Sequence, residues 1–181
     1  MSRYFVSISL PADLQKSMDQ ILPESRYWRK TDPRQLHLTL RYIGDADAGV
    51  LKELEDKLAK FDIPEFTLRL RDIGFFPKRG TVRVIWLGAE ISSTLIELHD
   101  FVDKAVSEVT NSESEHSFTP HVTLARVKGR VKKEKLLTVI PEIDDSFECR
   151  IQSFQLMESR QGKGGVEHLP VRTYQLNPKR K

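Results

Sequence analysis

The stretch His37-Leu38-Thr39-Leu40 occurs a second time, 84 residues further along the chain, as His121-Val122-Thr123-Leu124. Both copies are rich in apolar and β-branched residues, which favour a β-strand. Successive side chains of a strand point to opposite faces. The pattern therefore predicts two strands that each pack an apolar face on a core and present a His-Thr pair on the other face.

The repetition continues beyond these two strands. After each copy a short predicted helix leads to another strand, at 66–70 after the first copy and at 147–151 after the second. A further strand follows each of these, at 82–87 and at 171–176. A similarity that runs through three successive elements indicates a duplicated unit. We therefore expect a single domain over residues 1–181 that is made of two pseudo-symmetric lobes.

Hydrophobic periodicity supplies the remaining elements. Apolar residues spaced three and four apart predict helices over 14–22, 50–61, 95–109 and 133–140. Strands are predicted at 4–10, 36–43 and 121–127, and one continuous strand is predicted over 147–157. This order predicts an α+β fold that is bilobal and duplicated, with two mostly antiparallel sheets, outer helices and a central cleft.

Composition excludes several classes of protein. The chain has 181 residues, of which 39% are hydrophobic and 30% charged, as is usual for a globular domain. No apolar run approaches the ~20 residues of a membrane-spanning helix, and the N-terminus lacks the features of a secretory signal. The single Cys149 excludes an internal disulfide and a Cys-based zinc site. We expect a cytoplasmic monomer that does not bind membranes.

The net charge of +3 is compatible with a phosphate-bearing partner. Part of the positive charge lies at 128–135 and in the terminal Pro178-Lys179-Arg180-Lys181. A short basic end is most often solvated. If these segments do bind a nucleic acid backbone, the affinity should fall as the salt concentration rises.

The repeated residues indicate acid–base chemistry. One imidazole can accept a proton while the other, charged, donates one, and a Thr hydroxyl can donate to a phosphate oxygen. By the strand period, Arg41 shares the face of His37 and is a candidate phosphate contact. Two histidines without clustered Asp, Glu or Cys make a poor metal site. The residues therefore favour attack of water on a phosphodiester without a metal.

Further motifs surround the two strands. They are Arg3-Tyr4-Phe5-Val6-Ser7-Ile8, Gly74-Phe75-Phe76-Pro77, Val84-Ile85-Trp86-Leu87-Gly88, Phe118-Thr119-Pro120-His121-Val122-Thr123-Leu124-Ala125-Arg126-Val127 and Leu156-Met157-Glu158-Ser159. On these motifs the chain resembles the two-histidine (2H) phosphoesterase superfamily. Within it, the chain is similar to the bacterial and archaeal RNA 2′,3′-cyclic phosphodiesterases, historically called 2′-5′ RNA ligases. That family often has a Tyr about where this chain has His168.

The resemblance implies a bilobal fold whose cleft opens a 2′,3′-cyclic phosphate to a 2′-phosphate, without metal or cofactor. By position it makes His37 the proton donor to the departing 3′ oxygen and His121 the proton acceptor that activates water. Thr39 and Thr123 would hold the non-bridging oxygens, and Arg126 matches a phosphate-binding arginine of the family. Arg126 lies five residues after His121, an odd offset, so it reaches the same face only if the strand contains a bulge or ends there.

RNA 3′ ends or 2′,3′-cyclic nucleotides are the partners that the resemblance implies. Two alternatives stay open. One is a phosphodiesterase acting on 2′-5′ oligonucleotides or small cyclic phosphates, with weak reverse 2′-5′ RNA ligation. The other is a non-catalytic RNA-binding module. Trp28 and the pair Phe75-Phe76 could stack on a nucleobase, although core packing is the favoured interpretation of all three.

Overall fold

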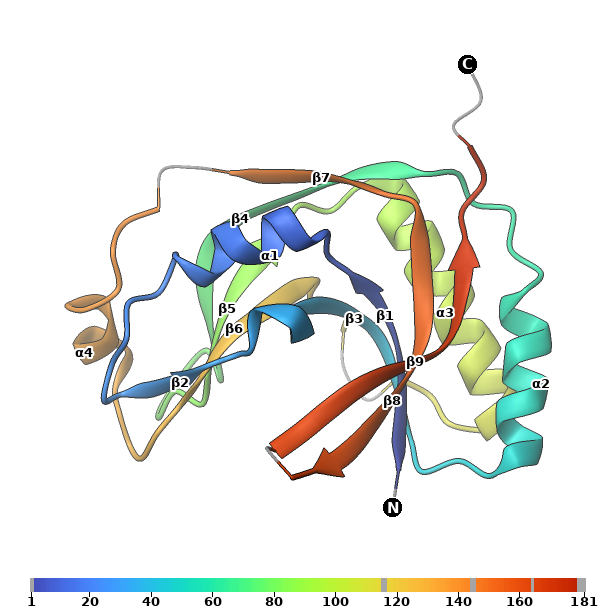
Figure 1. The fold of residues 1–181 in the computed structure, drawn as a ribbon, viewed down its shortest axis with the longest axis horizontal. Helices are drawn as coiled ribbons and strands as arrows, with labels where there is room; N and C mark the ends of the chain where they lie inside the picture. The colour runs from blue at the N-terminus through green and yellow to red at the C-terminus, as the bar shows by residue number, and fades with distance from the viewer. Residues whose placement is uncertain (1, 115–116, 144–145, 164, 179–181) are drawn as a thin grey trace.

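The computed structural model describes residues 2–114, 117–143, 146–163 and 165–178 (Figure 1). The terminal Lys179–Lys181 predicted to be basic and solvated lie outside this range. The strands are β1 (Arg3–Ser9), β2 (Trp28–Lys30), β3 (His37–Gly44), β4 (Phe66–Phe76), β5 (Val84–Ala89), β6 (His121–Val127), β7 (Phe147–Ile151), β8 (Ser153–Gly162) and β9 (Gly165–Gln175). The helices are α1 (Ala12–Asp19), the 3-10 helix η1 (Pro33–Gln35), α2 (Ala48–Leu58), α3 (Ser93–Thr110) and α4 (Lys133–Leu137).

The α+β class is confirmed, with two differences in the strands. The strand β2 was not predicted, because three residues are too few to show a period. The stretch 147–157, predicted as one strand, forms two that are separated at Gln152: β7 pairs with β4, and β8 pairs with β1 and β9.

The strands form one curled sheet in the order β7-β4-β5-β6-β3-β1-β8-β9, with β2 paired to β6 (Figure 1). We call β7, β4, β5, β6 and β2 the His121 half, and β3, β1, β8 and β9 the His37 half. The halves meet where antiparallel β3 and β6 have one pair in register, Leu38 and Val122. The two predicted sheets are these halves, joined through that pair.

The sheet order corrects two parts of the repeat. The stretches 66–70 and 147–151 were expected to be equivalent, but they are antiparallel neighbours, with Phe66 opposite Ile151. By its place in the order, β4 corresponds to β8, and β5, which was expected to match the strand at 171–176, corresponds to β1. The alternating pattern common to 66–70 and 147–151 therefore reflects pairing in the same half.

Helix α3 covers the apolar side of the sheet, where it lies against β3 and β4. Its stripe of Leu95, Leu98, Val102, Ala105 and Val106 is buried. Among the described residues, no helix combines the length and apolarity that crossing a membrane requires. Because α3 takes the apolar faces of the central strands, the polar faces of β3 and β6 are left for a site.

Candidate active site

The pair Leu38–Val122 brings the two His-Thr motifs together. Since β3 and β6 are antiparallel, this register places His37 beside Thr123 and Thr39 beside His121. Leu38 and Val122 are both 0% exposed, so the four polar side chains that flank them share the opposite face. The four are half-buried. The structure therefore brings together both predicted histidines and both predicted threonines.

Both histidines are held in the same tautomer. The Nδ1 atom of His37 lies 2.6 Å from the carbonyl oxygen of Gln35, and that of His121 lies 2.7 Å from the carbonyl oxygen of Thr119. A carbonyl oxygen can only accept, so Nδ1 carries the hydrogen in each neutral ring. Each histidine therefore has a free lone pair on Nε2, which can take up a proton.

Burial makes both rings poor at holding a second proton. The pKa of His37 is lowered to about 4, chiefly by burial and also by the charges of His168 and His121, while the bond to Gln35 opposes the shift. Burial also lowers the pKa of His121, against the bond to Thr119. His37 is the more deeply buried of the two, so it holds a proton less readily than His121.

A bulge in β6 brings Arg126 onto the face of His121. The register with β5 shifts between Ile85 and Trp86, and the consecutive residues Leu124 and Ala125 are both buried. The extra residue changes the phase of the strand, so that Arg126 is exposed on the polar face. This is the bulge that the odd offset required.

A bulge in β3 has the opposite effect on Arg41. The register with β1 shifts between Val6 and Ser7, which turns Arg41 toward α3. There its Nε lies 2.8 Å from the Oδ1 of Asp103. The prediction that Arg41 contacts phosphate is therefore wrong. Tyr42, 65% exposed and 5.9 Å from the Phe5 ring, takes the place in β3 that Arg126 takes in β6.

Aromatic rings support both histidines. The ring of Phe5 lies 5.1 Å from His37, and the ring of Phe76 lies 4.9 Å from His121. Trp86 lies 5.7 Å from His121 and covers Gly74, where a Cβ atom would come within 2.0 Å of the indole. Core packing was the favoured interpretation of Trp28, Phe75 and Phe76; it holds for Trp28 and Phe75, whereas Phe76 lines the site beside His121.

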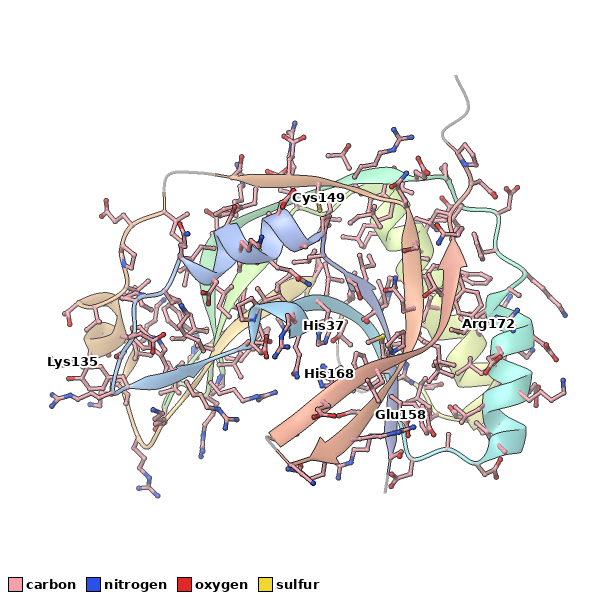
Figure 2. All side chains as sticks on the ribbon, viewed as in Figure 1. His37, Lys135, Cys149, Glu158, His168 and Arg172 are labelled. Atoms are coloured by element: carbon pink, nitrogen blue, oxygen red, sulfur yellow. The ribbon has the colours of Figure 1, made fainter. Side chains whose placement is uncertain are left out.

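A third histidine, His168, enters the site from β9. Its ring lies 5.1 Å from that of His37 (Figure 2) and 5.0 Å from that of Phe5. Its Nδ1 is buried without a hydrogen-bond partner among the described residues. Burial lowers the pKa of His168, as does the charge of Arg126. Arg126 from one half of the sheet and His168 from the other therefore face the same space.

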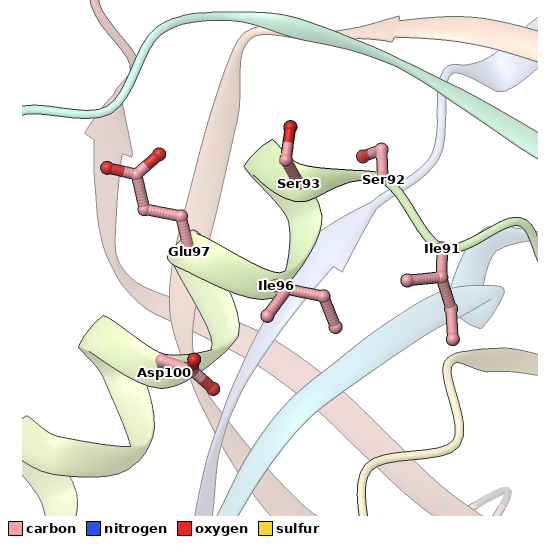
Figure 3. A pocket seen from close by; sticks show the side chains of 6 residues that line it. All are labelled: Ile91, Ser92, Ser93, Ile96, Glu97 and Asp100. Carbon is pink, nitrogen blue, oxygen red and sulfur yellow. The ribbon is translucent and has the colours of Figure 1, made fainter.

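Two surface pockets differ in their position relative to the site. A pocket of about 440 Å³ borders the site, lined by Trp86, Thr119 and Pro120 among others. Another, of about 540 Å³ at the start of α3, contains none of the site residues (Figure 3).

Cys149 lies on β7, away from His37 (Figure 2), and burial raises the pKa of its thiol to about 11. It is therefore unsuited to act as a nucleophile at neutral pH.

Comparisons with known proteins cover nearly the whole chain. A family model described as the 2′-5′ RNA ligase superfamily matches residues 10–163. The RNA 2′,3′-cyclic phosphodiesterase of Aeropyrum pernix is 31% identical over 118 residues, which are 65% of this chain and 67% of that protein. That of Methanothermobacter thermautotrophicus is 26% identical over 184 residues, 96% of this chain and 98% of the relative. The crystal structure of E. coli LigT complexed with 3′-AMP superposes with a TM-score of 0.82 at 26% identity, covering 97% of this chain and 98% of LigT.

We expect the His37 imidazole to titrate near pH 4 and that of His121 below 6.5, because burial disfavours the charged rings. Long-range proton–nitrogen NMR spectra recorded against pH, assigned with the single alanine variants, measure both pKa values and the tautomers. A His37 that titrates at 6.5 or above, or a neutral ring with its hydrogen on Nε2, would contradict the geometry described above.

Proposed function

The chain belongs to the 2′-5′ RNA ligase superfamily, the 2H phosphoesterases, and on that premise we propose that it hydrolyses the 2′,3′-cyclic phosphate ends of RNA to 2′-phosphates. This membership confirms the resemblance drawn from the motifs. The observation that carries the proposal is the pair of His-Thr motifs on one face, with both imidazoles in one tautomer. Relatives that are RNA 2′,3′-cyclic phosphodiesterases support it. We further propose a single domain of two pseudo-symmetric lobes, acting as a cytoplasmic monomer.

The reaction needs one proton acceptor and one proton donor on opposite sides of the phosphorus. Water attacks the phosphorus in line with the 3′ oxygen and gives a proton to Nε2 of His121. The bond from phosphorus to the 3′ oxygen breaks, and that oxygen takes a proton from Nε2 of His37. A bond from phosphorus to the water oxygen replaces it, which leaves the 2′-phosphate. Each histidine contributes as a general acid or general base.

The remaining residues would hold the charge of the phosphate. Arg126 lies on the face of His121 and can donate to a non-bridging oxygen as a charged partner. Thr39 and Thr123 lie beside the two histidines, where their hydroxyls can donate to the other oxygens. Fixed donors at the phosphate stabilise the charge that builds up in the transition state.

His37 can act as a proton donor only if substrate binding raises the pKa of its imidazole. In the free protein the pKa of His37 lies at about 4, so this ring is neutral at pH 7. A bound phosphodiester brings a negative charge next to the ring and raises its pKa, since an opposite charge favours the protonated form. His37 therefore becomes protonated when the substrate binds, and it can then donate that proton to the 3′ oxygen.

We expect His37→Ala and His121→Ala each to lower kcat/KM on a 2′,3′-cyclic nucleotide by about 10²–10⁴-fold, because each removes one half of the acid–base catalysis. The double variant should lose little more than either single variant, since the two act as a unit. His99→Gln, at a histidine of α3 stacked on Phe118, serves as the control and should retain activity.

A phosphodiester with a p-nitrophenol leaving group then separates the two roles. This leaving group needs little protonation, so His37→Ala should recover much of its rate on bis(p-nitrophenyl) phosphate while His121→Ala should not. Recovery in His121→Ala instead would reverse the roles. Near-full turnover of the cyclic nucleotide by either single variant would end the paired mechanism.

Arg126→Gln and Arg41→Gln form a matched pair, because the two bulges turn these arginines to opposite faces. Removal of Arg126 should lower kcat/KM by about 10–100-fold, as a hydrogen bond to a charged group is worth about 1.5–3 kcal/mol. Arg41→Gln should lower the Tm, because it breaks the pair with Asp103, and leave kcat/KM close to that of the parent. Steady-state kinetics and thermal unfolding measure both. Equal kinetic losses in the two variants would refute the assignment of Arg126.

A further inference from the structure

The positive charge of this protein is concentrated in three short stretches. Residues 26–30, 76–84 and 126–135 contain twelve of the 29 Lys and Arg residues but only one of the 26 acidic residues, Glu134. The rest of the chain therefore carries 17 basic and 25 acidic residues. The small net charge of +3 is therefore the sum of three strongly basic stretches and an acidic remainder of the chain.

The fold brings these stretches together at one end of the His121 half. Strand β2 pairs with β6, the Val127 N–H donates to the Arg83 carbonyl at 2.9 Å, and the Lys128 N–H donates to the Tyr27 carbonyl at 2.7 Å. Figure 1 shows β2, α4 and the end of β6 close together, and Figure 2 places Lys135 at this end of the molecule. We define the cationic surface as Arg29, Lys78, Arg79, Arg83, Arg126, Lys128, Arg130, Lys132, Lys133 and Lys135.

The charges of the cationic surface are not neutralised by acidic side chains. All ten residues are exposed, and none forms an ion pair with an acidic residue in the part of the chain that the structure describes. Most other arginines are paired: Arg34, Arg41, Arg69, Arg71, Arg150, Arg160 and Arg172 each contact an Asp or Glu. The excess of positive charge is thus left for a partner outside the protein.

One pair within this surface is unfavourable without such a partner. Arg29 of β2 lies directly opposite Arg126 of β6, and both are exposed. Like charges directly opposite on neighbouring strands are destabilising. Anionic groups bound between the two guanidinium groups would remove the repulsion and use both forks as donors.

The same pair connects the surface to the active site. Arg126 lies on the face of His121, and its charge acts on His168 on the other half of the sheet. Arg29 is the next side chain outward across the strands. A chain of phosphates that starts between the histidines therefore meets Arg126 first, then Arg29, and then the lysines and arginines of 128–135.

We propose that the cationic surface binds the phosphodiester backbone of the RNA strand whose cyclic 3′ end lies in the cleft, so that the strand is held at phosphates beyond the reacting one. This rests on the proposed function, and it adds a binding surface outside the cleft to that site. Contacts to phosphates carry no sequence information. The surface therefore favours longer RNA strands, which carry more phosphates, and it does not discriminate between RNA sequences.

The test compares two substrates with one reacting group: a ten-nucleotide RNA ending in a 2′,3′-cyclic phosphate, and a 2′,3′-cyclic mononucleotide. At low salt, kcat/KM should be higher for the RNA than for the mononucleotide. In a plot of log kcat/KM against log salt concentration, the RNA should show an additional slope of about −0.7 for each phosphate bound. The triple variant Lys128→Gln, Arg130→Gln, Lys132→Gln should reduce that slope by about 2 and lower kcat/KM on the RNA about 10-fold or more. Its activity on the mononucleotide should not change.

A second triple variant controls for net charge. Lys16→Gln, Lys60→Gln and Lys104→Gln remove three positive charges at exposed positions outside the cationic surface and should leave both substrates unaffected. Equal losses in the two triple variants would show a general charge effect and would overturn the proposal. So would equal kcat/KM values and salt slopes for the two substrates.

Turnover of the cyclic mononucleotide checks the proposed function separately. If neither substrate is turned over, the proposed function fails, and the surface is tested by fluorescence anisotropy with the same ten-nucleotide RNA. Weaker binding by the first triple variant alone would then support the backbone contact. Equal binding by the parent and both triple variants would refute it.

Discussion

A single pair of buried side chains, Leu38 and Val122, determines where the reactive groups lie. It is the only residue pair in register between β3 and β6, and it joins the two halves of the sheet. A shift of either strand by one residue would turn its His and Thr toward the core and its apolar residues toward the cleft, which burial strongly opposes. The hydrophobic effect at this junction thus fixes the spacing of the acid and the base.

The strand period predicted the faces of the four His and Thr residues, but it could not predict the bulges. Arg41 and Arg126 were assigned alike to the phosphate, and a bulge beside each sends one to α3 and the other to the cleft. In β6 the bulge is signalled by two consecutive apolar residues, Leu124 and Ala125. In β3 no such signal exists, because Arg41 itself follows Leu40. His168 lies on a strand that is exposed on both faces over most of its length, so no period marks its orientation.

The electrostatics of the cleft and of the surface around it both favour the binding of an anion. Burial lowers the pKa values of His37, His121 and His168, and the charge of Arg126 adds to the effect on His168. The unpaired cations beside Arg126 attract an anion to a site whose imidazoles are neutral until that anion arrives. The phosphate backbone thus supplies binding energy, and the reacting cyclic phosphate supplies the charge that lets one histidine hold its proton.

The measurement that tests the central claim most directly is the fate of the oxygen atoms in one turnover. A 2′,3′-cyclic phosphate substrate is incubated with the protein in ¹⁸O-labelled water and EDTA, and the product is separated and weighed by mass spectrometry. The account predicts a 2′-phosphate that carries a single ¹⁸O, with no 3′-phosphate. A 3′-phosphate product, or a reaction that stops in EDTA, would contradict metal-free attack of water opposite the 3′ oxygen by the two histidines.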